Sequence, residues 1–257
     1  MMKTEKYKEI PFSIERKMTE DATRIGMKIP FIHSCWEVDV HDIRIKIRKI
    51  RKEQKSTLSL STYLMYCFVF TINANKNLHG MKSWKNTIFQ FEDIDVLFPI
   101  ELQNKVLSPK IIRSANRKSI FELEDEIQQT RAKQDSKIDF YRRCFLRLPR
   151  VFRDFYYHQL VMKNPKLRKD SLGTVYFTSG NINSTTKAHG IPIPMHSIGM
   201  FLGSTENKLV EFNGEIVKRN HVAITNSADH RIVDGAVLAR FMVELKRNIE
   251  TLIDSDL

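Results

Sequence analysis

The segment DHRIVDG, residues 229–235, contains side chains that can do acid–base chemistry: a histidine lies between an aspartate and an arginine, and a second aspartate follows four residues later. Imidazole is the usual general base near neutral pH. The strand-like run HVAITNSA precedes His230 and an amphipathic helix follows from near Asp234, so we expect the imidazole at a strand-to-helix junction. Asp229 and Asp234 are candidates to position a basic group, and Gly235 to relieve crowding at the turn. A lone histidine beside a turn is also commonly structural, so the local pattern leaves both interpretations open.

Helical spacing and capping residues predict the elements that surround this junction. Thr19 followed by two acids indicates a helix start within 17–25, and Asp42 is a candidate cap for a helix over 42–54. Ser59 or Ser61 is a candidate cap for an apolar helix over 62–76. Further helices are expected over 119–134, over 140–163 with a kink at Pro149, and over 234–253.

Alternating and β-branched runs predict the strands, at 29–40, 86–91, 94–102, 107–112, 173–182 and after the proline-rich loop at 191–197. Asn213-Gly214 lies between two alternating runs, which is the strongest short hairpin signal in the chain. No repeat, low-complexity tract or linker interrupts the mixture of strands and helices. The expected class is therefore α/β or α+β.

The segment 140–163 is rich in both aromatic and basic residues. Phe145, Leu148, Phe152 and Phe155 recur at helical spacing, and Arg143, Arg147 and Arg150 lie on another face. Nucleic-acid and membrane-surface helices have this pattern. A core helix with arginines on its solvent-exposed face has the same pattern and is commoner, so we favour the core interpretation.

Composition limits the classes of protein that the chain can belong to. Of its 257 residues 42% are hydrophobic, and 42 basic against 30 acidic residues give a formal net charge of +12. That charge favours an anionic partner such as nucleic acid, anionic lipid or a phosphorylated cofactor, without choosing among them. Three widely spaced cysteines predict neither disulfides nor a zinc site. The longest apolar run, 63–72, is half a membrane span, and no signal peptide is recognisable, so we expect a cytoplasmic protein without metal.

DHRIVDGA followed by LARFMVELKRNIE resembles the active-site signature of the dihydrolipoyl acyltransferase catalytic domain of 2-oxo acid dehydrogenase complexes. Chloramphenicol acetyltransferase shares that fold and has a related HxxxDG motif. The resemblance extends in order through PFSIERKMTEDATRI, LSLSTYLMYCFVFTINANKNLHG, VLSPKIIRSANRKSIFELEDEI, GTVYFTSGNI and IPIPMHSIGMFLGS. It implies a two-layer α/β (α+β) sandwich, with a mixed sheet and helices, in which residues 1–257 form a single catalytic domain.

The resemblance also implies a reaction, the transfer of an acyl group between a coenzyme A thioester and a thiol or hydroxyl acceptor. His230 would be the general base, and Thr178 would stabilise the oxyanion, with Ser179 taking that place if the register shifts by one. Asp234 would form an ion pair with an arginine near the first helix, for which Arg16 is the candidate. Arg231 would join this network or turn outward.

The implied assembly is a homotrimer with active sites in channels between subunits. The histidine and the hydroxyl of each site would come from neighbouring chains. Basic residues at the channel mouth would attract the phosphates of CoA, and Trp36 and Trp84 would either stack on adenine or, as we favour, pack. The chain has no recognisable lipoyl domain, so we expect no covalent lipoyl group on it and a dihydrolipoyl acceptor is one option among others. A catalytically silent trimeric scaffold is the alternative, and a nucleic-acid or membrane-surface binder is the least favoured interpretation.

Overall fold

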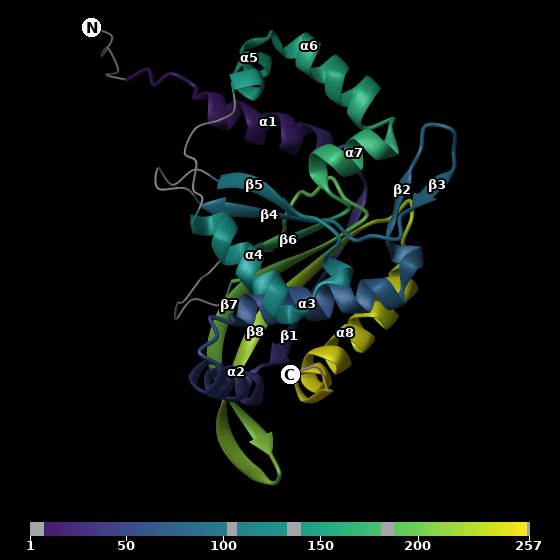
Figure 1. The fold of residues 1–257 in the computed structure, drawn as a ribbon. Coiled ribbons are helices and arrows are strands. Elements are labelled where there is room, and N and C mark those ends of the chain that lie inside the picture. The colour runs from purple at the N-terminus through teal and green to yellow at the C-terminus, as the bar shows by residue number, and fades with distance from the viewer. Residues whose placement is uncertain (1–7, 102–106, 133–139, 181–187, 256–257) are drawn as a thin grey trace, which may run out of the picture.

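The computed structural model describes residues 8–101, 107–132, 140–180 and 188–255. Its centre is a six-stranded mixed sheet in the order β1-β8-β7-β6-β4-β5 (Figure 1). Strands β6 and β7, and β6 and β4, are parallel, whereas the other neighbours are antiparallel. The bounds of these strands are β1 Phe31–Asp39, β4 Val96–Glu101, β5 Leu107–Ile112, β6 Val175–Ser179, β7 Ile198–Phe212 and β8 Glu215–Asp229.

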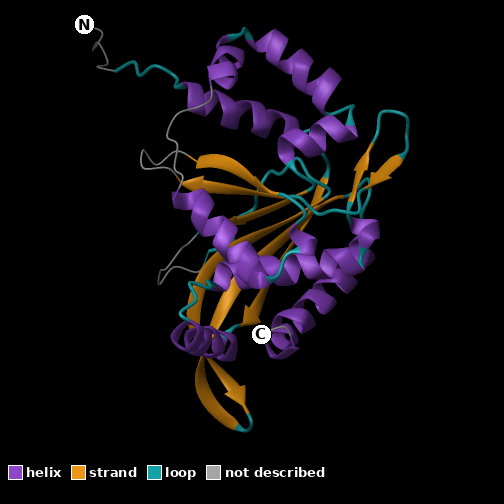
Figure 2. Ribbon diagram, in the orientation of Figure 1, coloured by secondary structure: helices purple, strands orange, loops and turns teal. Residues whose placement is uncertain are grey.

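One face of the sheet is covered by a layer of helices, which Figure 2 shows in purple beside the orange strands. The layer comprises α2 (His41–Gln54), α3 (Leu60–Ala74), α4 (Ile120–Ala132) and α8 (Gly235–Ser255). Helix α3 is apolar on nearly every side and therefore lies in the centre of this layer. Phe68 of α3 packs edge-to-face against Phe241 of α8, with ring centroids 6.1 Å apart. The two-layer mixed α/β architecture expected from the sequence is confirmed.

A second group of helices lies beyond β4 and β5, on the other side of those strands from α3 and α4 (Figure 1). It consists of α1 (Ile14–Gly26), α5 (Phe140–Arg147), α6 (Arg150–Phe155), the π-helix η3 (Tyr156–Val161) and α7 (Pro165–Leu172). A small antiparallel hairpin, β2 (Gly80–Lys82) with β3 (Ile88–Gln90), projects beside α7. In the described part of the chain, no helix has the length and apolarity needed to cross a membrane.

Several sequence predictions about these elements are confirmed and others are wrong. Ser59 caps α3 through its hydroxyl, and Asn213-Gly214, both with positive φ, turn β7 into β8. Helix α1, however, begins at Ile14 with Ser13 as its cap, so Thr19 lies inside the helix. Asp42 does not cap α2 but lies in its first turn, where it pairs with Arg219.

The interpretation of residues 140–163 as a core helix is largely wrong. The chain breaks at Pro149 as expected, but Leu148, Phe152 and Phe155 are exposed by 43%, 62% and 62%. Leu146 and Val161 are buried, and so is an arginine. Arg153 donates through Nε and Nη2 to the carboxylate of Asp21, at 2.8 and 3.2 Å, and so ties α6 to α1. A buried cation requires such a partner.

Candidate active site

The candidate site is the turn between β8 and α8, which backbone hydrogen bonds hold on two sides. Asp229 donates its N–H to the carbonyl of Ser197 (2.9 Å), and His230 donates to the carbonyl of Pro30 (2.8 Å). Within the turn, the N–H of Val233 donates to the carbonyl of Asp229 (2.9 Å). The Val233 side chain is buried in the core. The strand-to-helix junction predicted for His230 is confirmed, and its backbone is fixed.

The His230 imidazole is exposed in the single chain, with Nδ1 lying 3.1 Å from the Val233 carbonyl oxygen. A carbonyl oxygen can only accept a hydrogen bond, so Nδ1 must be the nitrogen that carries the proton. The neutral ring then has its lone pair on Nε2. Among the described residues, no side chain hydrogen-bonds to Nε2. The geometry therefore presents an unprotonated nitrogen outward, as a general base requires.

The carboxylate that the turn buries is that of Asp229, not that of Asp234. Asp229 accepts from the backbone N–H of Arg231 (3.1 Å), from its Nε (2.9 Å) and from its Nη2 (2.6 Å). Arg168 of α7 is buried nearby and donates to the Met195 carbonyl. Burial lowers the pKa of Arg168 to about 10, and the charge of Asp229 opposes this shift. Arg231 therefore does not join an Asp234–Arg16 network in the described part of the chain: its side chain is 36% exposed and pairs with Asp229 instead.

Asp234 and Arg16 do not form the expected ion pair within the described part of one chain. Both are exposed, and Arg16 lies in the first turn of α1, ten residues and about 15 Å of helix from Gly26, the end nearer the His230 turn. Gly235 does not relieve crowding either. A Cβ there would meet nothing within 4 Å, and the residue is simply the first of α8.

Thr178 and Ser179 end strand β6, where alternation sends them to opposite faces. Phe177 is buried in the helix-covered core, so Thr178 points to the other face and Ser179 back toward the core side. Beside Thr178 lies Tyr176, whose pKa is raised by burial and lowered in part by a hydrogen bond with the threonine. Tyr176 in turn stacks on His196, at 5.9 Å between centroids. This environment makes Thr178 the candidate that faces away from the core.

The strand register separates Thr178 from His230 within one chain. Asp229, the last residue of β8, lies opposite Ser197, the residue directly before β7. Continuing the strand register across the sheet, Ser197 lies opposite Thr174, the residue directly before β6. Thr178 is four residues farther along β6, which at about 3.3 Å per residue is roughly 13 Å, and two strands away, which adds roughly 10 Å sideways. A single substrate atom cannot touch both groups in one chain. The structure therefore does not bring these two predicted residues together.

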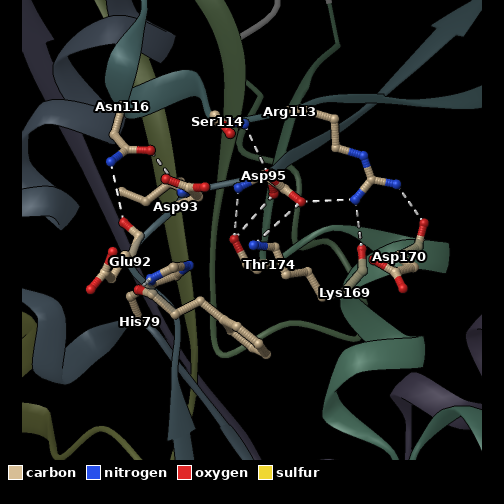
Figure 3. A network of polar contacts seen from close by, with 12 residues as sticks. His79, Glu92, Asp93, Asp95, Arg113, Ser114, Asn116, Lys169, Asp170 and Thr174 are labelled. Carbon is tan, nitrogen blue, oxygen red and sulfur yellow. Dashed lines mark hydrogen bonds and ion pairs between the residues drawn. The ribbon is translucent and has the colours of Figure 1, made fainter.

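A polar network holds β6 in this register, as Figure 3 shows. The backbone of Asp95 accepts from the N–H of Thr174 (2.7 Å), and its own N–H donates to the Thr174 hydroxyl (2.9 Å). The Asp95 carboxylate accepts from Arg113 (2.8 Å) and from the N–H of Ser114 (2.9 Å). Arg113 also donates to the carbonyls of Lys169 and Asp170. The network joins β4, β5, α7 and β6 and so positions the strand that carries Thr178.

Sequence reasoning missed part of the site for identifiable reasons. Arg168 lies more than sixty residues before the turn, so no local pattern associates it with Asp229. His196, expected to be structural, is buried and has Nε2 2.8 Å from the Leu172 carbonyl. Burial lowers its pKa to about 3, so it stays neutral. Among the described residues, no three His, Cys, Asp or Glu side chains gather as metal ligands would.

The fold is that of an acyltransferase catalytic core. A probable dihydrolipoamide acetyltransferase from Listeria monocytogenes superposes with a TM-score of 0.75 at 19% identity, over 98% of this chain and 97% of that one. A chloramphenicol acetyltransferase superposes with a TM-score of 0.54 at 13% identity, over 93% and 98%. At these identities the likeness concerns the fold.

The family follows from the sequence match. Residues 3–138 and 158–255 match the model of the 2-oxoacid dehydrogenases acyltransferase catalytic domain, and the chain belongs to that family. The dihydrolipoyllysine-residue acetyltransferase component of the pyruvate dehydrogenase complex of Rickettsia conorii is 25% identical over 255 residues. The match covers 96% of this chain and 54% of the relative, so the chain spans about half the length of that protein. Residues 139–157, which include α5 and α6, lie outside the matched ranges.

Proposed function

We propose that this chain is the catalytic domain of a CoA-dependent acyltransferase in which His230 is the general base. The observation that carries the proposal is the hydrogen bond between His230 Nδ1 and the Val233 carbonyl, because it leaves Nε2 as the basic nitrogen. The ion pair between buried Asp229 and partly exposed Arg231 fixes the turn from which the imidazole projects. The family membership supports the reaction class.

In the proposed reaction, Nε2 of His230 takes the proton from an acceptor thiol, and the thiolate sulfur attacks the carbonyl carbon of the acyl-CoA thioester. The tetrahedral oxyanion accepts a hydrogen bond from the Thr178 hydroxyl. When the intermediate collapses, the carbon–sulfur bond to CoA breaks, and the CoA thiolate takes the proton back from the imidazolium. A preorganised donor such as Thr178 contributes about 3–4 kcal/mol to a transition state of this kind. A dihydrolipoyl group is the first acceptor to test, because the relatives are dihydrolipoyllysine-residue acyltransferases.

We further propose that each site forms between two subunits of a homotrimer. Support comes from the register, which separates His230 from Thr178 by more than a hydrogen bond can span in one chain. In this arrangement the base of one chain meets the hydroxyl of its neighbour. Asp234, exposed at the start of α8, is proposed to position the same turn in the assembly.

The test is acyl transfer from a panel of acyl-CoAs to dihydrolipoamide, with His230→Ala compared to wild type. His189→Ala is the matched control, because that histidine is also exposed and its nearest carboxylate, Glu37, is 4.0 Å away. We expect a loss of about 100-fold or more in kcat/KM for His230→Ala and little change for the control. Wild-type protein without activity on any donor would favour the alternative, a catalytically silent scaffold.

Mixing two inactive variants tests the subunit arrangement. His230→Ala and Thr178→Ala chains are unfolded together and refolded. If base and hydroxyl come from different chains, about one site in four regains both groups, and activity returns. Mixtures that stay as inactive as their components would contradict the shared site.

A further inference from the structure

Helix α6 has its polar and apolar sides reversed for a helix in water. Arg153 is 4% exposed and turns inward toward α1, whereas Phe152 and Phe155 are each 62% exposed and Val151 is 75% exposed. Leu148, at the corner between α5 and α6, is also exposed. One exposed apolar residue is ordinary, but adjoining ones on a helix form a patch that marks a binding surface. We call these four apolar side chains the α6 face.

The packing beneath α6 fixes this orientation. Arg153 donates to the Asp21 carboxylate of α1, and the Phe145 ring of α5 packs edge-to-face against Tyr156 and Tyr157, at 4.9 and 5.6 Å between centroids. These contacts join α5, α6 and η3 to one another and to α1. Figure 1 shows α5 and α6 on the side of α1 away from the sheet. The inner side of the segment is therefore occupied, and the α6 face points outward.

The charge around the α6 face is almost entirely positive. Residues 140–163 contain six Lys or Arg and one acid, Asp154. Arg147 and Arg150 lie on either side of the α5–α6 corner, Arg143 lies about one helical turn before Arg147, and all three are exposed. Asp154 is already paired with α1 and, at 3.5 Å, with Arg150. Among the described residues, no carboxylate pairs with Arg143 or Arg147.

An apolar helix face bordered by arginines matches the boundary between lipid headgroups and acyl chains. Anionic headgroups complement the arginines, and the phenylalanine, valine and leucine side chains enter the acyl region. A second copy of this chain fits less well, because a self-complementary contact would place arginines against arginines. A nucleic acid would use the aromatic rings and the arginines but would leave Leu148 and Val151 without a role.

We propose that the α6 face docks the protein on an anionic lipid bilayer, with its apolar side chains among the acyl chains and Arg143, Arg147 and Arg150 at the headgroups. The contact is peripheral, since no helix in the described part of the chain is able to span a bilayer. Residues 139–157 lie outside the ranges that match the family model, so the family match says nothing about this surface. The docking is independent of acyl transfer and does not rest on the proposed function.

Co-sedimentation with vesicles tests the docking. Vesicles of phosphatidylcholine alone are compared with vesicles that contain about 30% phosphatidylserine. The α6 variant, Phe152→Ser/Phe155→Ser, is matched by Leu209→Ser/Ile216→Ser, which changes apolar residues 74% and 78% exposed on the β7–β8 hairpin. We expect wild type and the hairpin variant to prefer the anionic vesicles, and the α6 variant to bind them about tenfold or more weakly. Equal binding by the α6 variant and wild type, or no binding of wild type, would overturn the proposal.

A comparison of charge variants separates the lipid from other partners. Arg143→Gln/Arg147→Gln should weaken binding to the anionic vesicles by about tenfold, and Lys52→Gln/Lys218→Gln, at exposed lysines elsewhere, should weaken it much less. Equal losses would overturn the proposal by showing attraction through net charge alone. A smaller assembly of the α6 variant than of wild type in light scattering would overturn it in favour of a second copy. Tighter binding to a single-stranded oligonucleotide than to vesicles would overturn it in favour of nucleic acid.

An indole placed in the α6 face reports insertion directly. We favoured packing for both native tryptophans, and Trp36 does pack against the core, but Trp84 is 65% exposed, so for Trp84 that expectation is wrong. Trp84→Phe therefore removes the exposed background, and Phe155→Trp/Trp84→Phe adds one indole to the face. On anionic vesicles containing brominated phosphatidylcholine, the added emission should shift to the blue and be quenched. Unchanged emission from protein that sediments with the vesicles would overturn the insertion.

Discussion

Replacing Asp229 by asparagine should destabilise the protein and reduce activity together, because one carboxylate serves both the fold and the turn. Asp229 is 1% exposed, and its oxygens accept three N–H groups from Arg231. It also supplies negative charge to buried Arg168. Asparagine has nearly the same shape and can keep the backbone contact. It removes the charge and directs an N–H₂ group at the guanidinium.

The expected loss in the free energy of unfolding is about 2–4 kcal/mol. A hydrogen bond to a charged group contributes roughly 1.5–3 kcal/mol. The Arg231 side chain is 36% exposed, so solvent screening puts its contribution at the low end of that range. The larger part arises at Arg168, where loss of the facing carboxylate leaves a buried cation less compensated.

Urea unfolding followed by circular dichroism measures the stability, and acyl transfer at low urea measures the activity. Asp125→Asn is the matched control, because Asp125 is exposed on α4 and should change stability by less than about 0.5 kcal/mol. We expect kcat to fall in Asp229→Asn even where the variant is fully folded, since the His230 turn loses its anchor. A variant with wild-type stability and kcat would refute the assigned role of the Asp229 carboxylate.

Three further predictions concern single residues. The pKa of His196 is about 3 in the folded state and about 6.5 in the unfolded state, so its contribution to stability is full above pH 6.5 and is lost on acidification. Between pH 7 and pH 5 the free energy of unfolding of wild type, measured by urea titration, should fall by about 2 kcal/mol more than that of His196→Gln. Parallel pH dependences of the two proteins would contradict this. Gly214→Ala should cost about 1–2 kcal/mol, because φ is +83° there, and an unchanged urea midpoint would argue against the turn geometry. Arg153→Ala should cost about 1.5–3 kcal/mol, because buried Asp21 loses one of its two arginine partners and keeps Arg24, and a loss below 1 kcal/mol in thermal unfolding would argue against burial of the pair.

Local patterns were sufficient for most of the elements because each carries its own signal. Ser59 lies directly before an apolar run, and Asn213-Gly214 lies between alternating runs, so a cap and a turn can be recognised within a few residues. Helix α7 and strand β2 were missed because they are short and have little periodicity. The position of α7 depends on partners such as Arg113, which lies more than fifty residues earlier and donates to the carbonyls of Lys169 and Asp170.

Charge and aromatic content were harder to interpret than periodicity. Phe152 and Phe155 have the spacing of a buried face, yet the structure buries Arg153 between them. The reason is a carboxylate on a helix more than a hundred residues away, Asp21, which compensates the guanidinium. Trp84 is exposed because the hairpin turn that carries it projects from the sheet. A partner distant in sequence thus decides the burial of Arg153, and the path of the backbone decides the exposure of Trp84.

The separation of His230 and Thr178 leads to a last prediction, on concentration. If each catalytic site needs residues from two chains, an isolated chain has a base without an oxyanion donor, and its activity should fall by roughly 100-fold or more. Specific activity should then decline on dilution along the same curve as the assembled fraction measured by light scattering or mass photometry. A protein that keeps full specific activity as a monomer must bring another donor to His230. In that case Thr178 would be a strand residue hydrogen-bonded to Tyr176, and the shared site would be wrong.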